Sequence, residues 1–100
     1  MVLAAVVTAT LTITVWPQGT DGRSGTHLVR CPRDPVCARL ARVNAPFAPV
    51  PKGVACAQIY GGPQVALVTG TYAGRRVWAR FKRTDGCQIQ RWNRIAFLLR

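Results

Sequence analysis

The chain has 100 residues and carries fourteen Lys and Arg against three Asp and Glu, which gives a net charge of +11 at pH 7. This length suffices for one core, so we expect residues 1–100 to form a single domain. Three carboxylates, one histidine and no nucleophile motif leave no acid-base pair, and the sequence therefore predicts a protein that is not an enzyme. The basic excess favours an acidic partner, which could be nucleic acid, an anionic surface or the acidic face of an enzyme.

The first twenty residues carry no charge, yet they do not have the pattern of a membrane helix. Threonines alternate with apolar residues, and this period of two predicts a half-buried strand over 8–15. No basic residue precedes Arg23, so the positively charged start of a secretory signal is missing. We expect residues 1–7 to be the remnant of an export signal or an artificial start.

Turn-forming residues over 16–25 predict a hairpin tip, after which 26–31 returns to strand-like composition. Within this strand His27 is interpreted as a surface residue rather than a catalytic group. A helix is predicted over 34–43, because the segment opens with Asp and Pro, an N-cap residue followed by a first helical residue. Three prolines then predict an extended connector over 46–53.

A second hairpin is predicted from 64–71 and 75–84, and the latter strand has one apolar face and one basic face. Trp78 lies between two arginines on the basic face. There it could stack a nucleic-acid base, pack under the arginine stems or cover a neighbouring subunit. No glycine-aromatic ribonucleoprotein motif accompanies it, so nucleic acid is not the expected partner. A short turn or helix over 87–91 and a closing strand over 95–99 complete the expected elements.

The cysteines are even in number and are expected to form disulfides. A metal site would need all four, or three with the single histidine, and the spacings do not fit the usual zinc ligand patterns, so we expect neither metal nor cofactor. Four cysteines allow three pairings, of which local geometry favours Cys31–Cys37 and Cys56–Cys87. Such bonds indicate an oxidising compartment.

Residues 54–63 form the segment of greatest functional interest. Cys56 stands two residues before a short polar and aromatic stretch, and Gly61–Pro63 closes that stretch before the next strand begins. A loop held at both ends can enter a protease cleft as a substrate does, because its ordering cost is already met. The alternative interpretation is a disulfide-anchored turn between two strands.

From its first strand to its C-terminus the chain resembles the Streptomyces subtilisin inhibitor family of secreted bacterial serine-protease inhibitors. Four segments and Cys87 carry the resemblance, and these segments are 11–15, 37–40, 56–60 and 70–77. The resemblance implies an α+β domain stapled by disulfides, with a five-stranded antiparallel sheet and two short helices. It also implies a homodimer assembled through the sheet.

The resemblance further implies a scissile bond between Gln58 and Ile59, with Gln58 in the primary specificity pocket of the protease. Two departures from the family loop add freedom to it: Ala57 replaces a proline, and Gly61–Pro63 replaces a tighter Asp-Pro. The Cys31–Cys37 loop is also shorter than the family's. The residues expected to contact the protease around the scissile bond are Val54, Ala55, Cys56, Ala57, Tyr60 and Gly61.

The sequence thus predicts a secreted, extracellular inhibitor whose partner is a subtilisin-like serine protease, and no membrane association. Two alternatives stay open. In the first the protein is a basic module that binds nucleic acid or an anionic surface. In the second the same scaffold carries a loop that no longer inhibits.

Overall fold

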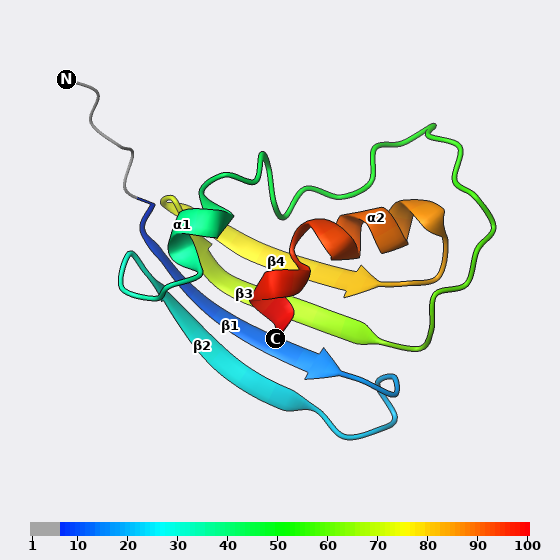
Figure 1. The fold of residues 1–100 in the computed structure, drawn as a ribbon, viewed down its shortest axis with the longest axis horizontal. Coiled ribbons are helices and arrows are strands. Elements are labelled where there is room, and N and C mark those ends of the chain that lie inside the picture. The colour runs from blue at the N-terminus through cyan, green and yellow to red at the C-terminus, as the bar shows by residue number, and fades with distance from the viewer. Residues whose placement is uncertain (1–6) are drawn as a thin grey trace.

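A four-stranded sheet with helical segments on one of its faces makes up the protein (Figure 1). The computed structural model describes residues 7–100. In chain order its elements are β1 (Ala9–Trp16), β2 (Gly25–Cys31), α1 (Cys37–Leu40), β3 (Val65–Tyr72), β4 (Arg75–Lys82), α2 (Gly86–Arg94) and the 3-10 helix η1 (Ala96–Leu99).

The sheet is antiparallel throughout and has the strand order β2-β1-β3-β4. The threonine-rich strand β1 is one of the two inner strands, and its apolar positions, such as Leu11 and Ile13, are fully buried. Its threonines alternate onto the other face, where they pair across both neighbouring strands. The predicted alternation over 8–15 is therefore confirmed, as are the strands expected over 26–31, 64–71 and 75–84, within one or two residues at each end.

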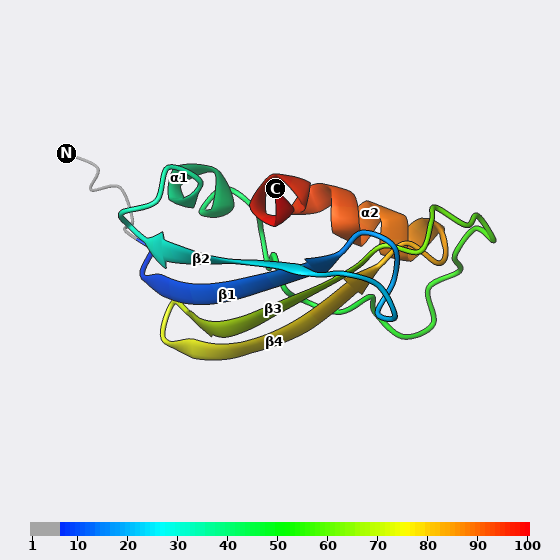
Figure 2. The ribbon, with the colours of Figure 1, turned by 90° about the horizontal axis from the view of Figure 1, so that it is seen from below.

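All the helical segments lie on one side of the sheet (Figure 2). The buried apolar side chains of the strands point to that side and meet Leu40, Ile95 and Leu98 from the helical segments. The other face of the sheet is left uncovered in the described part of the chain (Figure 2). Residues 7–100 include no helix long and apolar enough to span a membrane.

The expected five-stranded sheet is wrong, because the sheet has four strands and the segment 95–99 does not extend it. This segment forms η1 instead, in which Leu98 N–H donates to the carbonyl oxygen of Ile95 (2.9 Å). A repeat of three residues places Ile95 and Leu98 on the same side, and both are buried against the sheet. An extended strand would turn them to opposite faces and expose one of them.

The expectation of two helices is also wrong, since only α2 is longer than a single turn. The helix predicted over 34–43 is limited to the four residues of α1. The carboxylate of Asp34 accepts a hydrogen bond from the N–H of Val36 (3.1 Å), and this places Asp34 in a turn that precedes the helix. The turn or helix expected over 87–91 is α2, whose N-cap is Asp85.

The two predicted disulfides are present, joining Cys31 to Cys37 and Cys56 to Cys87. The first ties the end of β2 to α1, and the second ties the connector between α1 and β3 to the start of α2. The interpretation of residues 1–7 as a signal remnant falls on residues that, apart from Val7, lie outside those the structure describes.

Candidate functional site

The segment 54–61, which we call the exposed loop, follows a long connector that leaves α1 and returns past the N-terminal end of α2 to begin β3 (Figure 1). It has no regular secondary structure, and six of its eight residues are exposed, while Cys56 and Gly61 are half-buried. Its conformation must therefore come from contacts with other elements. Two groups of contacts do this, one before and one after the tip.

The first group fixes Cys56 and Ala57 to the start of α2. Besides the Cys56–Cys87 disulfide, the N–H of Gly86 donates to the carbonyl oxygen of Ala57 (2.9 Å). A Cβ added at Gly86 would come within 3.1 Å of the Ala57 side chain, so glycine permits this close approach. The carboxylate of Asp85 accepts from Gln88 N–H (2.9 Å), which fixes the helix end that holds the loop.

The second group fixes Gly61 to Arg83, in the segment between β4 and α2. Gly61 N–H donates to the carbonyl oxygen of Arg83 (2.7 Å), and Arg83 Nε donates to the carbonyl oxygen of Gly61 (3.2 Å). The guanidinium of Arg83 also donates to Asn93 Oδ1 (3.1 Å) and lies over the ring of Trp92. Both backbone groups of Gly61 are thus paired, and the arginine that pairs them is itself held by α2.

The tip between these two attachments consists of Gln58, Ile59 and Tyr60. All three are exposed, with 57% of Ile59 and 68% of Tyr60 accessible to solvent. Ile59 N–H donates to the carbonyl oxygen of Ala57 (2.9 Å) in a tight turn centred on Gln58. Within residues 7–100 the backbone N–H and C=O of Gln58 make no hydrogen bond, so both remain available to a partner.

The structure brings the predicted site residues together on one short surface segment. Gln58, Ile59 and Tyr60 are displayed, whereas Cys56 and Gly61 are half-buried attachment points. Sequence reasoning missed Arg83, Asp85 and Gly86, which hold the loop. The spacing of Asp85 and Gln88 is that of a capping box and could have located the start of α2, but no local pattern marks Arg83.

The single histidine has a structural position. His27 Nε2 lies 3.0 Å from the carbonyl oxygen of Leu98, to which it donates, and this contact joins β2 to η1. His27 is thus half-buried on the inner face of the sheet, and the expectation that it lies on the surface is corrected to this extent.

A small domain stapled by two disulfides fits a protein that is not an enzyme.

The side chains of Cys56, Asp85 and Cys87 place one ligand-type atom each within 4.8 Å of the others. Their donor capacity is already used, however. The two sulfurs are bonded to each other, and the Asp85 carboxylate caps α2. This cluster therefore supports the position of the exposed loop.

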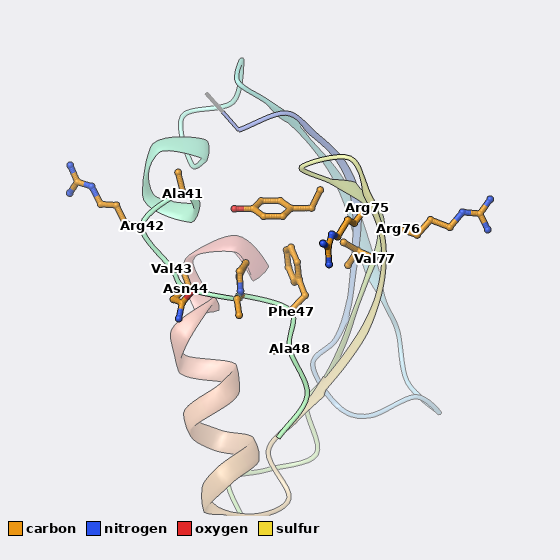
Figure 3. A pocket seen from close by; sticks show the side chains of 12 residues that line it. Ala41, Arg42, Val43, Asn44, Phe47, Ala48, Arg75, Arg76 and Val77 are labelled. Carbon is orange, nitrogen blue, oxygen red and sulfur yellow. The ribbon is translucent and has the colours of Figure 1, made fainter. Parts of the chain in front are cut away.

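A hollow of about 680 Å³ lies at the opposite end of the β3–β4 hairpin from the loop tip (Figure 3). Phe47 and Tyr72 meet edge to face within it, with ring centroids 5.3 Å apart, and burial raises the pKa of Tyr72 above its ordinary value. The side chains of Arg42 and Arg76 extend away from the hollow. The contact between these two rings packs the connector between α1 and β3 against the β3–β4 hairpin.

Comparison with protein-family models, with curated proteins and with solved structures finds no match to this chain. What the protein does must therefore be inferred from the exposed loop and the surfaces around it.

Proposed function

We propose that this protein is a secreted inhibitor of subtilisin-like serine proteases that inserts the exposed loop as a substrate would, with Gln58–Ile59 as the scissile bond. The observation that carries the proposal is the attachment of the loop on both sides of an exposed tip. Two disulfides suggest an oxidising, extracellular environment, which is where such a protease would be met.

Two attachments close to the scissile bond favour tight binding with slow cleavage. A flexible substrate loses conformational entropy when it is bound, whereas a fixed loop has lost most of it on folding. If the bond between Gln58 and Ile59 is cut, the Cys56–Cys87 disulfide retains one new end and Arg83 retains the other. The two ends stay near each other, so resynthesis of the bond competes with release.

The tip residues favour a protease with a broad, apolar cleft. Gln58 is uncharged and matches no pocket built for a cationic side chain, while Ile59 and Tyr60 offer apolar surface beyond the scissile bond. The two departures from the loop of the subtilisin inhibitor family should also weaken inhibition less than the sequence alone suggests. Gly62 has φ +120°, a conformation that favours glycine, and Ala57 is held by Gly86 without the help of a proline.

The proposal is tested by inhibition of subtilisin with the disulfide-intact protein and two variants at one position. Gln58→Pro removes the free N–H that a protease would pair with, whereas Gln58→Ala keeps it and removes only the side chain. We expect Gln58→Pro to lose inhibition by at least about tenfold, the effect of roughly 1.4 kcal/mol, and Gln58→Ala to retain it within a few-fold.

Mass spectrometry of the mixture provides an independent reading of the same bond. Slow cleavage of the parent between Gln58 and Ile59 is expected, with the two fragments held together until the disulfides are reduced. The proposal is wrong if the parent neither inhibits subtilisin nor is cut at this bond, or if Gln58→Pro inhibits as well as the parent.

A further inference from the structure

The uncovered face of the sheet carries a row of basic side chains interrupted by a tryptophan. Along β4 the outward positions are Arg76, Trp78, Arg80 and Lys82, and all four are exposed. Trp78 has 71% of its surface accessible, although an indole of this size is ordinarily largely buried. Successive outward residues on a strand stand roughly 7 Å apart, so Trp78 has a cation on either side along the strand.

A hollow of about 310 Å³ lies beside Trp78 on the same face. Trp16, at the end of β1, and Trp78, on β4, both line it, and β3 lies between these two strands. Its volume is at the small end of the range for ligand pockets, which suits one planar ring rather than a long ligand. The remaining lining residues are Thr20, Val65, Leu67 and Arg80.

Charge favours an anionic occupant for this face over a second copy of the chain. Of the three acidic residues, Asp34 and Asp85 bind backbone N–H groups in loops that lead into helices, and Asp21 lies in the turn between β1 and β2. None belongs to a strand of the sheet. Two copies packed face to face would bring their β4 cations together without compensating carboxylates, in a chain of net charge +11.

We propose that this face binds single-stranded nucleic acid, with one base stacked on Trp78 at the hollow and neighbouring phosphates on Arg76, Arg80 and Lys82. Stacking on an exposed aromatic ring and pairing of phosphates with flanking cations are the two interactions by which sheets bind single strands. A sulfated polysaccharide would satisfy the cations but would leave the indole without a planar partner. The exposed loop is not part of this face, so the two activities are independent.

Fluorescence anisotropy with a fluorescein-labelled oligothymidylate of about 15 nucleotides tests the proposal. Trp78→Ala is expected to weaken binding roughly 5- to 150-fold, and Trp78→Phe to recover most of the loss, because a base stacks on any aromatic ring. Tyr60→Ala removes an equally exposed aromatic from the loop and should leave binding unchanged. Equal affinity of the parent and Trp78→Ala would overturn the proposal.

The salt dependence of the affinity distinguishes contacts between particular side chains and phosphates from the general attraction of a basic protein for an anionic strand. Arg80→Gln should reduce the slope of log affinity against log salt by about 0.7, while Arg42→Gln, an exposed arginine outside the sheet, should not change it. Two further results would overturn the proposal. One is that heparin binds as tightly as oligothymidylate and that Trp78→Ala changes the affinity for neither ligand. The other is a parent that sediments as a dimer, binds no oligonucleotide and becomes monomeric with Trp78→Ala.

Discussion

At the scale of single residues, Gly70 shows how closely β3 approaches β1. It pairs with Leu11 and has φ +131°, and a Cβ added there would stand 2.0 Å from the carbonyl oxygen of Thr10. That oxygen belongs to the backbone of the central strand, which cannot move without disturbing two strand pairs. Gly70 therefore has no room for any side chain.

Gly70→Ala is expected to lower the free energy of unfolding by about 3 kcal/mol, from the clash together with backbone strain. Urea denaturation measures the change. Gly25→Ala is the matched control, because no atom lies within 4 Å of the added Cβ and Gly25 has no positive φ; its effect should stay within about 0.5 kcal/mol. Similar losses for the two variants would contradict the close approach of β1 and β3.

At the scale of elements, α2 and the segment that leads into it form the platform of the exposed loop. Cys87 and Gly86 hold one side of the loop tip and Arg83 holds the other. The same helix is fixed to the sheet by Arg91, whose side chain donates to the carbonyl oxygens of Ala48 and Arg80 and covers the ring of Phe81. Burial lowers the pKa of Arg91 below its ordinary value.

Arg83→Met removes one loop hydrogen bond and keeps most of the side-chain volume. We expect the loop to open more often and thermolysin, a protease outside the proposed inhibitory mechanism, to cut within 57–61 roughly 2- to 10-fold faster. Arg42→Met, at an exposed arginine remote from the loop, is the control and should leave the rate unchanged. An unchanged rate in Arg83→Met would mean that the Cys56–Cys87 disulfide and the backbone hydrogen bonds of Ala57 and Gly61 hold the loop without the Arg83 side chain.

At the scale of the whole molecule, the two disulfides close chain segments of very different length. Cys31 and Cys37 are separated by 6 positions in the sequence, and Cys56 and Cys87 by 31. The longer closure also links the connector to the last third of the chain. It should therefore restrict the unfolded state more.

Replacement of Cys56 and Cys87 by serine is expected to cost about 4 kcal/mol of unfolding free energy, and the same change at Cys31 and Cys37 about 2 kcal/mol, on the chain-entropy estimate. Urea denaturation of the two double variants against the parent measures both losses, and each serves as the control for the other. A larger loss at Cys31 and Cys37 would show that the short disulfide acts mainly on the native state.

The sequence by itself predicted the elements whose cause is local. Alternation of apolar and polar residues located β1 and β4, strand-like composition between turn-forming residues located β2 and β3, and local geometry favoured the two disulfides that are present. The segment 54–61 could be recognised as a displayed loop because of Cys56 and the glycines that follow its tip. In each case neighbouring residues carry the signal.

Only the tertiary structure decided the features that depend on distant parts of the chain. Ile95–Leu99 is a continuous apolar run that suits a strand or a helical turn equally well, and burial of Ile95 and Leu98 against the sheet selects the turn. Arg83 holds Gly61 across 22 positions of sequence, and no pattern near either residue indicates the contact. Such choices are made by packing and pairing between separate elements, which local propensity does not determine.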